Sequence, residues 1–152
     1  FMLRARIDDV LKTAMKSKET HTVATVRLIM AALKDRDIAA RSKGNKDGIS
    51  DDEILSMLQS MIKQRRESVE MYEKGGRAEL AEQEASEITI IETFLPEQMD
   101  DDAIAAAIAE AIADAEASSL KDMGKVMGLL KERFAGEMDF SKASGLVKSK
   151  LA

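Results

Sequence analysis

The chain has 152 residues, of which 45% are hydrophobic and 34% are charged, so it is long enough for one folded domain or two small ones. It contains no cysteine, which excludes a disulfide, a thiolate metal site and a cysteine nucleophile. No apolar run approaches the roughly 20 residues that span a bilayer, and charges occupy the positions near Met2 where a signal peptide would be apolar. We therefore expect a cytoplasmic protein without membrane contact.

Apolar residues recur at three- and four-residue spacing along almost the whole chain, which is typical of amphipathic helices. No segment shows the alternation of a strand. The first part of the chain predicts four helices, at about residues 3–16, 22–41, 51–74 and 78–94. The third helix begins at a capping box, Ser50-Asp51-Asp52-Glu53, and ends at the glycine pair 75–76.

A break is predicted at Pro96, the only proline, because the residue before a proline disfavours helical backbone. We place the domain boundary there, between an N-terminal helical domain at residues 2–96 and a C-terminal helical domain at residues 97–152. The second domain predicts three helices, the first two capped by Asp100 and Ser119, over about residues 101–115, 120–135 and 142–151. The predicted fold is all-α, with a four-helix part followed by a small three-helix tail domain.

The net charge of −5 argues by itself against general nucleic-acid binding. The charges are unevenly distributed, however. Residues 97–116 hold seven acidic side chains and no basic one, whereas residues 117–152 hold seven basic and four acidic side chains, a net charge of +3. Local fields act on a ligand more strongly than the sum over the whole chain, so the last two predicted helices are the favoured place for an anionic ligand.

No pattern in the sequence predicts a catalytic or metal centre. His21 is the only histidine, and a general base or metal ligand needs partners, so we interpret it as an exposed or helix-capping side chain. Glutamates three residues apart, such as Glu84 and Glu87, interleave with basic residues and are typical of solvated helix faces. Ser118-Ser119-Leu120-Lys121 has the spacing S-x-x-K but lacks the companion motifs of penicillin-binding enzymes. We therefore expect no catalytic residue, no cofactor and no metal.

One segment of the predicted 120–135 helix stands out: Lys121-Asp122-Met123-Gly124-Lys125-Val126-Met127-Gly128. A glycine inside a helix costs about 0.8–1 kcal/mol relative to alanine, so two glycines four residues apart need a local reason. Gly124 and Gly128 fall together beside the apolar seam, and Lys121 and Lys125 continue that stripe toward solvent. Such a strip would let a phosphate backbone approach closely. We expect the main role of the glycines to be tight packing against the last helix, which has its own Gly145, and this role is compatible with phosphate contact by the neighbouring lysines.

The same segment resembles a signature of a known family. It is similar to the K-D-M-G-K-V-M-G signature of the GatB/YqeY family, and Phe94-Leu95-Pro96-Glu97-Gln98-Met99 is similar to that family's Y/F-L-P-x-Q-L/M junction. Shorter matches are Lys63-Gln64-Arg65-Arg66-Glu67-Ser68, Val26-Arg27-Leu28-Ile29 and Ala32-Leu33-Lys34. The resemblance spans nearly the whole chain and departs from the family pattern just before the signature, where Ala117-Ser118-Ser119 replaces the common G-A.

The resemblance implies an amino-terminal helical domain joined to a tail domain. That tail is similar to the carboxy-terminal domain with which the GatB component of tRNA-dependent amidotransferases engages tRNA. Because the chain resembles this tail without the catalytic parts, a carbon–nitrogen ligase label on the family would reflect the shared domain. We therefore predict a non-catalytic tRNA- or RNA-binding accessory protein related to translation. Its predicted contact residues are Lys121, Gly124, Lys125, Gly128, Lys148 and Lys150.

Two alternative functions stay open. The chain could be a protein-interaction module that docks through the acidic helix at 101–115 or the charged helices of the first domain. It could also be an accessory component of an amidotransferase with glutamine as amido donor, active only with separate catalytic subunits. Aromatic residues make up only 3% of the chain, which argues against stacking on bases, so we expect no readout of single strands. We also expect no binding to DNA.

Overall fold

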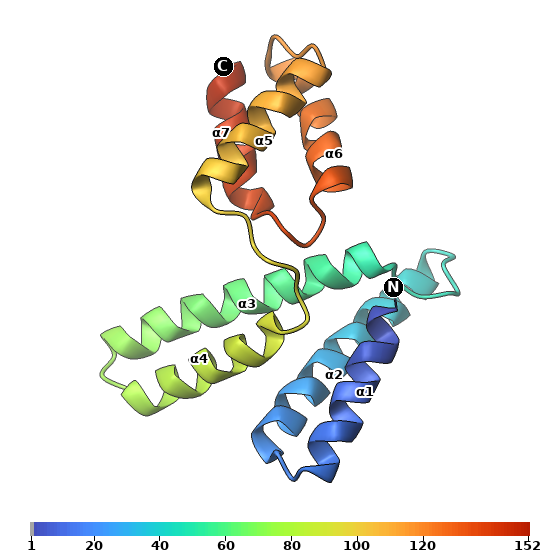
Figure 1. Cartoon of the computed structure of the whole chain (residues 1–152), viewed down its shortest axis with the longest axis vertical. Coiled ribbons are helices and arrows are strands. Elements are labelled where there is room, and N and C mark those ends of the chain that lie inside the picture. Colours follow the sequence, from blue (N-terminus) through green and yellow to red (C-terminus); the bar gives the residue numbers. More distant parts are fainter. Residues whose placement is uncertain (1) are drawn as a thin grey trace. The chain divides into compact units, whose positions relative to one another are not determined.

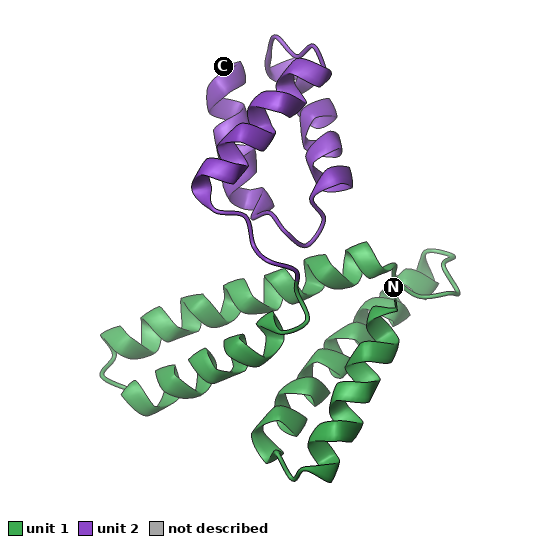
Figure 2. Ribbon diagram, viewed as in Figure 1, with its two compact units in different colours: residues 1–95 green, residues 96–152 purple. Residues whose placement is uncertain are grey.

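The computed structural model describes residues 2–152. These residues form seven α-helices, one short 3₁₀ helix and no strand (Figure 1), which confirms the predicted all-α fold. The chain divides into two compact units, residues 1–95 and 96–152 (Figure 2), and the division falls one residue before the predicted domain boundary. None of the helices within residues 2–152 combines the length and the apolarity that crossing a bilayer requires.

The first unit consists of two helical hairpins. In one, α1 (Leu3–Lys16) lies along α2 (Thr20–Ser42), and in the other α3 (Asp51–Lys74) lies along α4 (Ala78–Glu92) (Figure 1). Three- and four-residue spacing gathers the apolar side chains of each helix on one face. These faces meet in a core of fully buried side chains, which includes Leu3, Ile7, Val26, Ile29, Ile54, Met57, Leu58, Ile91 and Phe94.

Local chemistry sets the helix ends of the first unit. The hydroxyl of Ser50 accepts the backbone N–H of Glu53, and the Glu53 carboxylate accepts the N–H of Ser50, both at 3.2 Å, which confirms the predicted capping box. α2 begins two residues before its predicted start, because Lys18 has a φ of 57° and reverses the chain in a short turn. α4 ends before residue 94, because the N–H groups of residues 93–95 bond carbonyls three residues back, ahead of Pro96.

A charged cluster fastens the segment between α2 and α3 to α1. Both terminal nitrogens of Arg4 donate to the Asp37 carboxylate at 2.8 Å, and Nη2 also donates to the carbonyl of Ile49 at 2.9 Å. Asp37 accepts the N–H of Ile49 at 2.9 Å. The Arg4 guanidinium holds the pKa of Asp37 below its ordinary value. At Gly48, with a φ of 87°, a Cβ would lie 2.7 Å from both charged side chains, so the cluster requires glycine there.

The second unit is a bundle of three α-helices: α5 (Asp101–Asp114), α6 (Met123–Arg133) and α7 (Phe140–Leu151). The predicted cap of α5 is confirmed, because the Asp100 carboxylate accepts the N–H of Ala103 at 2.8 Å. All three helices turn an aliphatic face inward. The core includes Ile104, Ile108, Ala111, Val126, Leu130, Met138, Ala143 and Val147.

The helix predicted at 120–135 is shorter and divided. A 3₁₀ turn, η1 (Leu120–Asp122), precedes α6, and the Asp122 carboxylate accepts the N–H groups of Ser118 at 2.9 Å and Ser119 at 3.4 Å. These bonds stabilise the tight turn in place of a first α-helical turn. α7 begins two residues before its predicted start, because the Asp139 carboxylate accepts the N–H of Lys142 at 3.1 Å and caps the helix.

Replacing Asp37 with asparagine should lower the free energy of unfolding by about 1–2 kcal/mol near neutral pH, because the partly buried site loses charge-assisted hydrogen bonds. The folded state lowers the pKa of Asp37, so its contribution is present above the ordinary carboxyl pKa and disappears as the pH falls through the folded value. Urea unfolding across this acidic range measures the difference. Asp47→Asn in the exposed loop is the control, and equal stability of D37N and the unmodified chain at neutral pH would contradict the assigned role.

Candidate nucleic-acid interface

The segment η1–α6 turns one face into the core and the opposite face outward. Val126 is fully buried, whereas the four predicted contact residues of this segment are exposed. Residues three and four positions apart are neighbours on a helix surface, so the two glycines form one row and the two lysines form the next. The structure therefore brings these predicted residues together on one exterior strip, which we call the α6 strip: Lys121, Gly124, Lys125 and Gly128.

The glycines of the α6 strip face open space. A Cβ added at Gly124, at Gly128 or at Gly145 of α7 would meet no heavy atom within 4 Å. The expectation that α7 packs tightly against the two glycines is therefore wrong. Neither glycine of the strip has a positive φ. Close packing and backbone conformation thus both fail to explain the two residues, of which Gly128 in the interior of α6 costs about 0.8–1 kcal/mol of helix stability and Gly124 in its first turn costs less.

The basic side chains of the second unit fall into two groups. Two of them are paired with carboxylates of α5: Lys142 with Asp101, and Arg133 with Asp114 at 2.8 Å. The four predicted contact lysines are exposed and belong to none of the ion pairs within residues 2–152, namely Lys121, Lys125, Lys148 and Lys150. A phosphate could therefore approach them without displacing a bound carboxylate.

Asp122 lies beside the strip and stays ionised. The N–H groups of Ser118 and Ser119 donate to its carboxylate and, with a smaller contribution from nearby Lys125, hold the pKa of Asp122 below its ordinary value. Asp122 thus stabilises the turn that starts the strip. Its negative charge also offsets part of the positive field of the lysines.

The two predicted lysines of α7 do not share one face with each other. Successive helix residues are about 100° apart, so Lys148 and Lys150 lie on opposite sides of the buried row that contains Val147. Lys150 lies eight residues after Lys142, about two helical turns, and therefore on the same side of α7. On that side Lys142 pairs with Asp101 of α5. α7 packs against both α5 and α6, so the flank of Lys148 is the one toward α6, and Lys150 is separated from the α6 strip.

Sequence analysis missed one lysine that borders the strip. Lys131 is exposed, belongs to none of the ion pairs of the described chain, and follows Gly128 by three residues. It therefore adjoins the glycine row on the side away from Lys121 and Lys125. The three-residue spacing between Gly128 and Lys131 was the feature of the sequence that could have predicted this position beside the glycines. Glu132, also exposed, follows Gly128 by four residues and marks an acidic limit of the strip.

The other candidate residues of the sequence have structural contacts. His21 is exposed, and its Nε2 lies 2.8 Å from the hydroxyl of Ser86 on α4. That hydroxyl donates to the carbonyl of Gln83 at 2.7 Å, so its proton is engaged elsewhere and the pair is not arranged as nucleophile and base. Glu84 and Glu87 lie 4.0 and 2.9 Å from Arg65. Residues 2–152 contain no cluster of three or more side chains suited to a metal ion.

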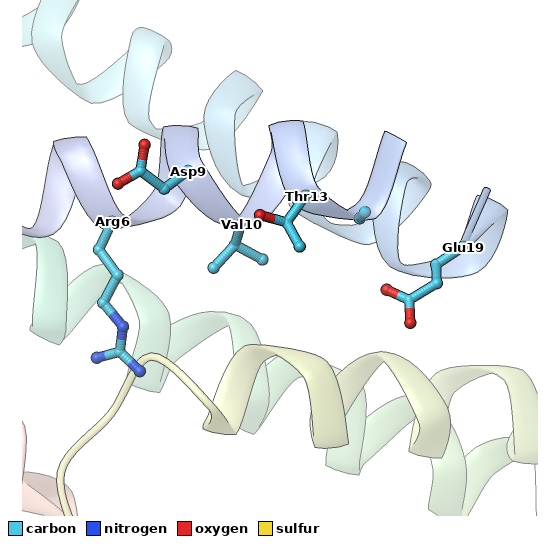
Figure 3. Close-up of a pocket in the computed structure, with 6 residues that line it drawn as sticks. Arg6, Asp9, Val10, Thr13 and Glu19 are labelled. Carbon is cyan, nitrogen blue, oxygen red and sulfur yellow. The ribbon is translucent and has the colours of Figure 1, made fainter. Parts of the chain in front are cut away.

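An open pocket of about 230 Å³ lies beside α1, lined by Arg6, Asp9, Val10, Thr13, Ala14 and Glu19 (Figure 3). Arg6 donates to the carbonyl of Thr93, and its guanidinium lies 5.6 Å from the centre of the Phe94 ring. The Arg6 side chain of the pocket therefore already binds the residues at the end of α4. The pocket is open to solvent and its only cation is already bound to the protein, so we assign it no ligand.

The fold and the α6 strip define a two-unit helical protein whose second unit carries a cationic, glycine-lined face. Residues 4–151 match the YqeY-like protein family, and the chain belongs to that family. This match confirms the YqeY part of the resemblance seen in the sequence. The likeness to the amidotransferase tail remains a prediction.

Several curated proteins are similar to the chain. An uncharacterized protein of Schizosaccharomyces pombe is 32% identical over 95 residues, which cover 62% of this chain and 73% of that protein. Altered inheritance of mitochondria protein 41 of Lachancea thermotolerans is 29% identical, over 76% of this chain and 56% of its own. The protein of the same name from Pyrenophora tritici-repentis is 27% identical, over 84% and 71%.

These relatives contradict the predicted cytoplasmic location, because those named for mitochondrial inheritance are mitochondrial proteins. The prediction rested on the absence of cysteine and on the lack of an apolar leader. Neither feature identifies a compartment, because targeting segments are removed from mature chains and a folded helical domain carries no record of them.

Replacing both Gly124 and Gly128 with alanine should stabilise the second unit, because each new methyl group meets open space; the gain is about 0.8–1 kcal/mol at the interior Gly128 and smaller at Gly124 in the first turn. Chemical unfolding followed by circular dichroism measures the change. Gly136→Ala is the contrasting variant and should destabilise the unit, because Gly136 has a φ of 77°. A loss of stability in the double variant would show that the glycines serve packing after all.

Proposed function

We propose that this chain is a non-catalytic accessory protein that binds structured RNA, tRNA in the first instance, through the α6 strip. The observation that carries the proposal is the juxtaposition of two helix glycines facing open space with exposed lysines that belong to none of the ion pairs of the described residues. Lys131 borders the same strip and Lys148 lies on the flank of α7 toward α6, so both join the proposed contact set. Lys150 lies on the other flank and is a weaker candidate.

The proposed contact depends on close approach of a phosphate backbone to a helix. At Gly124 and Gly128 no side chain stands between the α6 backbone and a ligand, so a sugar–phosphate chain could lie against the helix itself. Lys121 and Lys125 on one side, and Lys131 on the other, would then reach phosphate oxygens. Contacts of this kind position an RNA without reading its sequence, and they release counterions, which makes affinity depend on salt.

Aromatic side chains make no contribution to the proposed contact. Phe94 is fully buried, and Phe134 and Phe140 of the second unit are half-buried. Since bases of single strands stack on exposed rings, the second unit presents no such platform. The proposal is therefore restricted to the folded shape and the backbone of the RNA. The names of the relatives direct the search for that RNA to mitochondria.

Replacing Lys121 and Lys125 with alanine should weaken the binding of purified tRNA and reduce the slope of log affinity against log salt by about 1.4–1.8, since each phosphate contact contributes about 0.7–0.9. Filter binding at several salt concentrations, with circular dichroism to verify the fold, measures both quantities. Lys12→Ala with Lys16→Ala removes the same charge from α1 and should leave the slope unchanged. Equal affinity of the α6 double variant and the unmodified chain would remove the site assignment.

A further inference from the structure

Helix α2 carries a second apolar row on the side opposite its core face. Its core side chains, Val26, Ile29 and Leu33, are buried. On the other side, Leu28 is 45% exposed and Ile38 is 53% exposed, and the alanines between and before them are also exposed. A helix that is apolar on two opposite faces is typical of a helix with a partner on each. The first unit supplies a partner for only one of the two faces.

The outward residues of α2 follow a heptad spacing. Alternating steps of four and three residues give a seam of small and apolar positions interrupted by Asp35: Ala24, Leu28, Ala31, Asp35, Ile38 and Ser42. Directly before every second seam position stands a cation, at Arg27, Lys34 and Arg41, seven residues apart. In paired helices, the positions that flank the apolar seam carry the charged side chains that select the partner helix.

None of these three cations forms an ion pair within the described residues, although Arg41 lies near enough to Asp37 to help lower the pKa of that carboxyl. Arg27, Lys34 and Arg41 are exposed and belong to none of the ion pairs in residues 2–152. With a rise of 1.5 Å per residue, they stand about 10.5 Å apart in a straight row. The row complements a helix with acidic side chains at the same spacing, and it repels another basic one.

We propose that this outward face of α2 docks an amphipathic helix of a partner protein, one with a small apolar seam flanked by aspartate or glutamate. An antiparallel second copy of α2 fits poorly, because the cation rows would lie against each other, and a parallel second copy would set them against Ala32 and Ala39 without an acidic partner. Exposed Leu28 and Ile38 favour a protein helix over RNA, since phosphate contacts require no apolar seam. The two alanines let the partner backbone come close, and Asp35 selects a partner with a polar or basic residue opposite it.

The test uses the full chain and two synthetic helices of about three heptads, identical in their alanine and leucine seam. One carries glutamate at the flanking positions and the other carries lysine. The unmodified chain should bind the glutamate helix at least about tenfold more tightly than the lysine helix, because three charge pairs act together. R27E/K34E/R41E should reverse this preference. Leu28→Ala with Ile38→Ala should weaken the binding of the glutamate helix while the charge preference remains.

A matched control variant makes the same change in net charge as R27E/K34E/R41E, but at lysines outside α2. K12E/K16E/K18E alters three exposed cations of α1 and the turn after it and should leave the preference for the glutamate helix unchanged. Equal binding of the two helices to the unmodified chain, or failure to bind either, overturns the proposal. If R27E/K34E/R41E instead abolishes binding of purified tRNA and neither helix binds, the face is a nucleic-acid surface and the proposal is wrong.

Discussion

A helix that keeps two glycines on its outer face forgoes stability that alanine would supply, and nothing inside the second unit compensates for that loss. A Cβ at Gly124 or Gly128 would touch no other part of the unit. The cost, about 0.8–1 kcal/mol at Gly128 in the interior of α6 and less at Gly124 in its first turn, falls on a unit of only 57 residues, whose core is small for independent stability. We therefore propose that the reason for the glycines lies outside the unit, in a ligand that approaches that face, and the functional proposal follows from this constraint.

The carboxylates of the acidic helix α5 pair with some of the basic side chains of the second unit and leave the others available for a ligand. Its carboxylates at Asp101 and Asp114 pair with Lys142 and Arg133. The lysines around the glycine row have no such partner. The net charge of the chain therefore says little about the α6 strip, because intramolecular pairing neutralises some cations and leaves others exposed on one helix face. α5 thus packs one face into the core, and the aspartates at its two ends form ion pairs with two of the basic side chains of the bundle.

Helical periodicity and capping chemistry are local properties, and the sequence predicted them well. The all-α fold, the capping box at Ser50 and the cap at Asp100 are confirmed. Distances between helices are not local, which is why packing of Gly145 against Gly124 and Gly128 was a wrong prediction. Lys148 and Lys150 were both predicted as contacts, and the rotation of about 200° between residues two apart places them on different sides of α7. The cytoplasmic prediction was wrong because the absence of cysteine and of an apolar leader does not identify the compartment of a folded domain.

The central claim is that RNA covers the α6 strip, and lysine footprinting tests it most directly. The full chain would be acetylated with and without saturating tRNA, and the modification of each lysine would be measured by mass spectrometry. The account predicts protection of Lys121, Lys125 and Lys131, with Lys142 unchanged because its ammonium group already pairs with Asp101. Unaltered reactivity of the three strip lysines, or protection confined to lysines of the first unit, would contradict it.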